Sequence, residues 1–190
     1  MKKLLCLLLS CLLPLGMVAC GDDSIQVTAQ IQPMEELTYE EIWEIANPVN
    51  LVVELDMWIA KKCEYGDRME ALSEAERIFY VNNSLEMEVN NGGFAQFFFN
   101  SSGAFAAEVE QSLRAIGADA TADICKKAVE AFGQPLPLDQ LERDKLLEEI
   151  FTDEIAEILD GCDETFFQYQ DDLAALNYQF VMEHRDQFTE

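Results

Sequence analysis

The sequence predicts an all-α fold, a single compact domain of about six to eight helices. Three observations support this. Apolar residues recur at i, i+3 and i+4 along most of the chain, helix-capping patterns precede several of these segments, and no stretch shows the alternation of a half-buried strand. Residues 38–190 are long enough to enclose one hydrophobic core, so we assign them to one helical domain.

Capping boxes mark the first helices. Thr38, followed three residues later by Glu41, is predicted to open a helix that breaks at Pro48, and a second helix is expected to end at Gly66. The apolar stripe of that second helix consists of Leu51, Val52, Leu55, Trp58 and Ile59. Another capping box, Ser73 with Glu76, starts a third helix that we expect to reach Asn91.

Two further helices are expected over 104–116 and 120–132, separated at Gly117. Pro135 and Pro137 then form a stiff connector.

Asp139, with Glu142 three residues on, is predicted to cap a long acidic helix or helix pair that reaches Leu159. We expect Gly161 to interrupt this segment and Asp163 to cap the last helix. The inward-facing residues of that last helix would be Phe166, Leu173, Leu176, Phe180 and Val181.

The segment 88–103, EVNNGGFAQFFFNSSG, is the most informative part of the chain. Asn and Gly tolerate the left-handed conformation that ends helices, so Asn90–Gly93 predict a corner. Phe94, Phe97 and Phe98 share one helical face and predict a buried aromatic plug, and a second corner follows at Asn100–Gly103. The amides in this segment either lock loops through buried hydrogen bonds, which is the default, or line a small polar pocket. They are Asn90, Asn91, Gln96 and Asn100.

This segment closely resembles the signature of the bacterial DNA mimic protein family. The signature residues, mainly structural, are Glu88, Asn90, Asn91, Gly92, Gly93, Phe94, Gln96, Phe97, Phe98, Asn100 and Gly103. Upstream ERIFY at 76–80 and downstream AIGA at 115–118 extend the resemblance to roughly residues 72–188. The resemblance implies an all-α fold, homodimerisation, no known catalysis, and an acidic surface able to occupy the basic site of a DNA-binding protein.

The N-terminus is predicted to direct the chain out of the cytoplasm. Lys2 and Lys3 precede an apolar run too short for a membrane span, and Met17–Cys20 resembles a lipobox. We therefore expect a lipoprotein signal peptide at 1–19, lipidation of Cys20 and a tether over 20–37. Localisation would be the cell envelope, as a membrane-anchored lipoprotein that is periplasmic or surface-exposed. The alternative is an ordinary secretory signal.

The charge of the chain predicts the class of its partner. The formal net charge is −25, and loss of Lys2 and Lys3 with the signal would make it −27. Such a chain repels nucleic acid, so no direct nucleic-acid binding is expected, and it attracts basic proteins. The run from Leu146 to His184 holds eleven acids and no Lys or Arg. The candidates for a partner-facing acidic face are Glu148, Glu149, Asp153, Glu157, Asp171 and Asp172. The plainer interpretation is a solvated surface.

Signals for catalysis and for metal or cofactor binding are weak. His184 is the only histidine, no common nucleophile or nucleotide motif occurs, and neighbouring acids such as Glu148 and Glu149 point about 100° apart on a helix. We expect no enzyme, no cofactor and no metal site. Asp160, Asp163 and Glu164 lack the order of a calcium loop. Cys63, Cys125 and Cys162 are expected as small buried side chains, the alternative being one disulfide and one free thiol.

Together these features predict a non-catalytic acidic interaction module that binds a basic, DNA-binding-like protein through carboxylates on helices. Carboxylates on one helix are more widely spaced than phosphates in a duplex, so several helices or a dimer would have to share the imitation. Because the predicted export separates the protein from cytoplasmic DNA-binding proteins, the alternative is an envelope-anchored, immunity-type inhibitor of a secreted basic toxin or nuclease.

Overall fold

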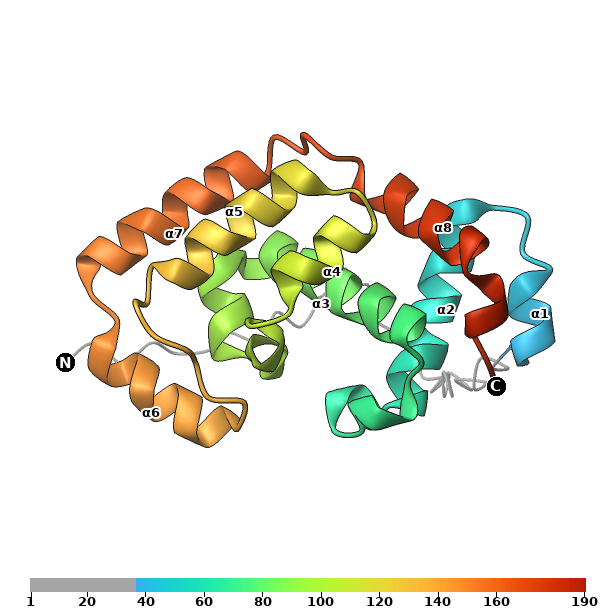
Figure 1. Ribbon diagram of the computed structural model, residues 1–190, viewed down its shortest axis with the longest axis horizontal. Coiled ribbons are helices and arrows are strands. Elements are labelled where there is room, and N and C mark those ends of the chain that lie inside the picture. Colours follow the sequence, from blue (N-terminus) through green and yellow to red (C-terminus); the bar gives the residue numbers. More distant parts are fainter. Residues whose placement is uncertain (1–36) are drawn as a thin grey trace, which may run out of the picture. The chain divides into compact units, whose positions relative to one another are not determined.

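From Leu37 onward the chain folds into helices and the turns that join them. The computed structural model describes residues 37–190; the predicted signal peptide, Cys20 and all but the last residue of the predicted tether lie outside the described residues. Within 37–190 there are eight α-helices, four short 3-10 helices and no strand (Figure 1). These residues belong to one compact unit. The predicted all-α class and helix number are confirmed.

Side-chain caps define the first two helices. Thr38 and Glu41 form the predicted capping box of α1 (Tyr39–Trp43). The side chain of Asn47 caps α2 (Pro48–Lys62), and Pro48 is its first residue. Proline is tolerated at this position because its missing N–H would have no partner inside the helix. Pro48 therefore begins the second helix as well as separating it from the first.

Two 3-10 helices, η1 (Glu64–Gly66) and η2 (Met69–Ala71), lead into α3 (Glu74–Phe99). The Ser73 side chain caps α3 as predicted. The backbone leaves helical geometry at Gly92 and Gly93, and Gly93 has φ 77°. The predicted corner is thus a kink that divides α3 into a long first segment and a short aromatic second segment.

After α3 the chain forms η3 (Ser101–Phe105), α4 (Val109–Ala115) and α5 (Asp119–Glu130). The helix predicted over 104–116 is shorter than expected, because the chain first turns in 3-10 geometry around buried Gly103 and Phe105.

The last elements are α6 (Gln140–Ile150), α7 (Asp153–Phe166), α8 (Leu173–Glu183) and η4 (Arg185–Gln187). Asp139 caps α6 as predicted. Two predictions here are wrong: Gly161 lies inside α7 without interrupting it, and the cap of the last helix is Asp172 instead of Asp163. A glycine costs an α-helix only about 1 kcal/mol, and the apolar face of α7 continues past it to Phe166, which therefore belongs to α7.

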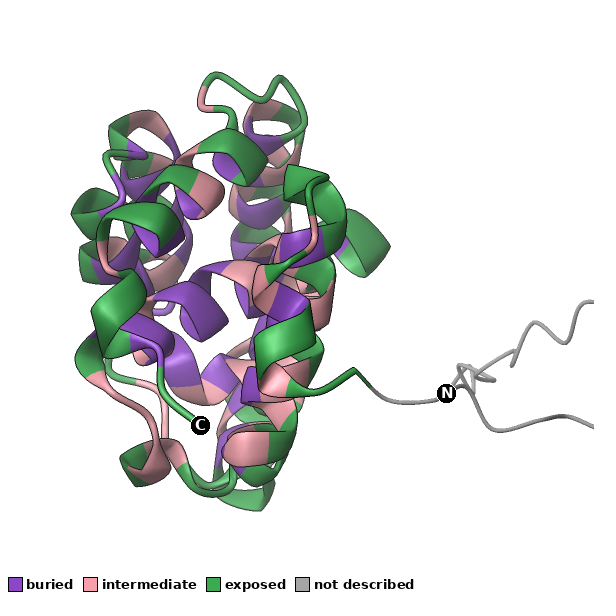
Figure 2. Cartoon of the chain, turned by 90° about the vertical axis from the view of Figure 1, so that its right-hand side faces the viewer, coloured by how far each residue is buried: buried purple, intermediate pink, exposed green. Residues whose placement is uncertain are grey.

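Helix α3 lies at the centre of the packing. Helices α2 and α8 and η4 contact it, and so do α4, α6 and α7, while α5 runs alongside α7 (Figure 1). Buried residues line the inside of this assembly and exposed residues its outside (Figure 2). The three cysteines of the described region, Cys63, Cys125 and Cys162, are free and buried, as expected. None of the helices between residues 37 and 190 is long and apolar enough to cross a bilayer.

Candidate functional site

One face of α7 carries a row of exposed carboxylates. We call Asp153, Glu157, Asp160 and Glu164 the α7 stripe. Their spacing of i, i+4, i+7 and i+11 places them on one side of the helix. The buried residues of α7 have the same spacing, shifted by two positions, and are Ile155, Leu159, Cys162 and Phe166. The stripe therefore lies opposite the core and spans about 16 Å along the helix axis.

Further exposed acids surround the junction of α6 and α7. Glu148 and Glu149 are exposed in the last turn of α6, and Glu154 is exposed in the first turn of α7. Within residues 37–190, none of these three acids and none of the α7 stripe pairs with a Lys, Arg or His. Four of the six predicted partner-facing acids are thus exposed near this junction.

The other two predicted acids serve helix ends. The Asp171 carboxylate accepts hydrogen bonds from the backbone N–H of Thr121 at 2.7 Å and from its hydroxyl at 2.9 Å, in the first turn of α5. Asp172 accepts from the N–H of Ala175 at 3.1 Å and caps α8. The position of Asp172 directly before apolar Leu173 is a capping signal that could have been recognised in the sequence.

The signature corner is held by a contact between two helices. Asp163, on α7, accepts a hydrogen bond from the backbone N–H of Phe94 at 2.7 Å. Burial raises the pKa of Asp163, and the bond from Phe94 opposes that rise. Phe94, Phe97 and Phe98 are almost fully buried, which agrees with the predicted aromatic plug.

Glu88 connects the two corners of the signature. Its carboxylate accepts hydrogen bonds from Gln96 Nε2 at 2.7 Å and Asn100 Nδ2 at 2.8 Å. These contacts tie the helix before the kink to the end of α3, so these two amides lock the loops. Asn90 instead donates to the Tyr169 hydroxyl, and Asn91 is exposed.

Arg143 joins two segments of the backbone, and the sequence analysis did not identify it. It is fully buried on α6, and its guanidinium donates to four backbone carbonyls. These belong to Phe98 (3.0 Å), Asn100 (2.7 Å), Pro137 (3.0 Å) and Leu138 (2.9 Å). Burial lowers the pKa of Arg143. A Cβ on Gly103 would clash with the Phe98 carbonyl oxygen and lie 2.7 Å from Arg143 Nε, which explains the signature glycine. The only sequence signal is an arginine four residues before Leu147, on the buried side of α6.

The family described as DMP19-like protein matches residues 70–184, more than half of the chain. The chain belongs to the DMP19-like family. No similar curated protein and no similar solved structure was found. The DMP19-like region contains the signature corner, Arg143 and the whole α7 stripe, whereas α1 and α2 precede it.

In the part of the chain that the structure describes, no group of three or more His, Cys, Asp or Glu side chains is arranged to hold a metal ion. The His184 ring stacks on Phe180, with centroids 4.2 Å apart, and its Nδ1 lies 2.9 Å from the Phe180 carbonyl oxygen. These contacts give His184 a structural place at the end of α8.

Proposed function

We propose that this DMP19-like protein is a non-catalytic interaction module that binds a basic, DNA-binding-like protein through the α7 stripe and the neighbouring end of α6. The observation that carries the proposal is the α7 stripe itself. Its four carboxylates are exposed, share one helix face and have no cationic partner within residues 37–190. Charge that is unpaired and regularly spaced attracts a surface of opposite sign and speeds association.

The spacing of the stripe supports a partial imitation of a nucleic-acid backbone. Neighbouring carboxylates are about 5 to 6 Å apart along the α7 axis, whereas duplex DNA presents a phosphate about every 3.4 Å per strand. Long Lys and Arg side chains on a DNA-binding surface adjust to such differences. Glu148 and Glu149 add charge beside the stripe, and a homodimer, which we also propose, would double the number of carboxylates presented.

Helix α5 packs against one side of α7, the helix that carries the α7 stripe. Its Lys126 and Lys127 are exposed, and the charge of Lys127 opposes the burial that raises the pKa of Cys162 on α7. Lys127 therefore lies close enough to α7 to weaken the negative potential there. The partner-binding side of α7 is accordingly the side away from α5.

A competition experiment tests this function. The mature protein would be used to capture partners from a cell lysate, and duplex DNA would then be added. We expect a basic DNA-binding protein to be captured by wild type and released by duplex DNA. A variant that neutralises the stripe (Asp153→Asn, Glu157→Gln, Asp160→Asn and Glu164→Gln) should lose it.

The matched control removes four exposed acids elsewhere, through Glu40→Gln, Glu44→Gln, Asp67→Asn and Glu74→Gln. This control should still capture the partner. If both variants lose it equally, net charge alone explains the binding. The proposal is contradicted if the stripe variant still captures the partner, or if duplex DNA does not release the partner from wild type.

Export and anchoring are a separate proposal that depends on residues 1–20. Radiolabelled fatty acid should enter the wild type and not Cys20→Ser, and label in both would refute lipidation at Cys20. Capture from envelope and culture fluid would extend the competition experiment. A secreted basic toxin or nuclease captured there, and not a cytoplasmic protein, would favour the immunity-type alternative.

A further inference from the structure

Helix α2 has two apolar sides, and the second one is uncovered. Leu51, Leu55 and Ile59 face the core and are almost fully buried. A second row at the same four-residue spacing, Val49, Val53 and Met57, is 63%, 51% and 46% exposed. A soluble helix that is apolar on more than one side is expected to be covered on each of them.

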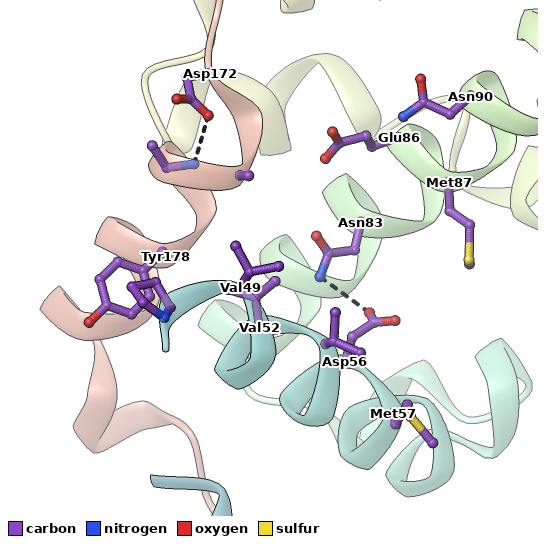
Figure 3. A pocket seen from close by; sticks show the side chains of 14 residues that line it. Val49, Val52, Asp56, Met57, Asn83, Glu86, Met87, Asn90, Asp172 and Tyr178 are labelled. Carbon is purple, nitrogen blue, oxygen red and sulfur yellow. Dashed lines mark hydrogen bonds between the residues drawn. The ribbon is translucent and has the colours of Figure 1, made fainter. Parts of the chain in front are cut away.

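The uncovered side of α2 forms the floor of a groove of about 780 Å³ between α2, α3 and α8 (Figure 3). Met87 of α3, 61% exposed, faces α2 across this groove, and Tyr178 of α8 contributes to the opposite wall. Methionine side chains adapt to the shape of different partners, and grooves with exposed methionines are suited to binding apolar helix faces.

Among residues 37–190, carboxylates are the only charged groups that line the groove. They are Asp56, Glu86 and Asp172. Burial raises the pKa of Asp56 to about 6, and its carboxylate accepts one long hydrogen bond, from Asn83 Nδ2 at 3.3 Å. Glu86 accepts from the Tyr169 hydroxyl at 3.2 Å, and burial raises its pKa as well. A cation beside Asp56 and Glu86 would compensate for the poor solvation of their carboxylates.

The charge and the length of the groove together select an occupant. A second copy of this chain would offer few cations to the groove carboxylates, because it holds 37 acids and only 12 Lys and Arg, so the proposed homodimer would use another surface. The lining residues of α2 extend from Pro48 to Met57, about 13 Å or two and a half helical turns. A partner helix with apolar residues on one side and Lys or Arg beside them matches both features.

We propose that the groove between α2, α3 and α8 binds a basic amphipathic helix of a partner protein. Its apolar side contacts Val53, Met57 and Met87, and its basic residues lie over Asp56 and Glu86. This site goes beyond the proposed function, since it is separate from the α7 stripe, and its α2 wall precedes the DMP19-like region.

The probe is a fluorescent 18-residue helix of Leu and Lys with all Leu on one side, and the comparison peptide has Ala in place of Leu. Binding would be followed by anisotropy at two salt concentrations. We expect the Leu/Lys helix to bind at least about tenfold more tightly than the Ala/Lys helix. The double variant Val53→Asn with Met87→Gln should lose that preference, and Asp56→Asn should weaken binding. Both apolar side chains are exposed, so the double variant should keep the wild-type circular dichroism spectrum.

The stripe variant that carries four neutralised acids on α7 is the matched control. It removes more charge than Asp56→Asn but leaves the groove intact, so the preference for the Leu/Lys helix should remain. Equal binding of both peptides, or an unchanged preference in the groove double variant, would overturn the proposal. Loss of the preference in the stripe variant with retention in the groove variant would also overturn it. Because the two variants alter different elements, failure of this proposal is distinguishable from failure of the proposed function.

Discussion

Asp163 on α7 caps the second segment of α3, by accepting a hydrogen bond from the backbone N–H of Phe94 at 2.7 Å. The kink at Gly93 leaves this N–H without a partner inside its own helix, and a carboxylate from a helix 69 residues away in sequence supplies one. Charge at a helix N-terminus is stabilising as well. The contact therefore joins the signature corner to the helix that carries the acidic stripe.

Gly93→Ala should destabilise the fold by about 2 kcal/mol or more. The φ of 77° is costly for any residue with a side chain, and the new Cβ would lie 2.9 Å from Asp163 Cγ, disturbing the cap. Equilibrium unfolding in urea measures the change.

Two other glycines are internal controls for Gly93→Ala. Gly92 has φ −162°, which any residue adopts, and a Cβ there would displace only the Gln96 side chain and its bond to Glu88, so Gly92→Ala should cost less than Gly93→Ala but not be neutral. Gly161 lies inside α7 with open space around it, and Gly161→Ala should stabilise by about 0.5 to 1 kcal/mol. Equal costs at Gly92 and Gly93 would show that backbone conformation does not explain the corner.

Arg143→Met should cost at least about 3 kcal/mol of unfolding free energy, because it leaves one buried and three part-buried backbone carbonyls without this donor. Arg143→Lys should recover little, since one ammonium group cannot reproduce the planar fork that contacts both the end of α3 and the Pro137–Leu138 connector. Thermal unfolding of both variants tests this. A lysine variant as stable as wild type would mean that positive charge alone is sufficient.

The contrast between these sites shows which features can be predicted from the sequence. Thr38, Ser73 and Asp139 were identified as caps because each bonds to an N–H three residues later, within the span of a local pattern. Asp163 was assigned to the wrong helix for the converse reason: its partner is 69 residues away. Arg143 was missed because two of the carbonyls that it binds lie at the end of α3, more than 40 residues away, and only the tertiary fold brings them beside the Pro137–Leu138 connector.

The groove between α2, α3 and α8 could not be predicted from the sequence, for another physical reason. The sequence shows that α2 is rich in apolar residues, and the stripe that includes Leu51, Leu55 and Ile59 was correctly assigned to the core. The sequence does not show whether the second apolar side of such a helix is also covered by a neighbour. Only the placement of α3 and α8 shows that Val53 and Met57 remain exposed.

Neutralising Glu157, Asp160 and Glu164 of the α7 stripe should leave the fold intact and slightly stabilise it. Glu157 and Asp160 are three residues apart and Asp160 and Glu164 four, spacings at which like charges destabilise a helix by about 0.2 to 0.5 kcal/mol per pair. Glu164 also lies near the C-terminus of α7, where the helix dipole disfavours a negative charge. Glu157→Gln, Asp160→Asn and Glu164→Gln together should raise the melting temperature at low salt, and the gain should shrink in 1 M salt. Loss of folding would show that these carboxylates are structural.

Asp56→Asn should stabilise the protein at pH 7 and not at pH 4. Because burial raises the pKa of Asp56 from 3.8 to about 6, the folded state holds this proton more tightly than the unfolded state. The stability that wild type gains from the protonated Asp56 carboxyl is therefore fully present below pH 3.8. It is lost as the pH rises towards 6, because the buried carboxyl must then ionise. An asparagine stays neutral and still accepts the bond from Asn83. With allowance for solvent screening, the gain in unfolding free energy should be about 1 to 2 kcal/mol at pH 7. Urea titrations of both proteins from pH 4 to pH 7 measure this difference, and a gain that is the same at every pH would contradict the assigned cause.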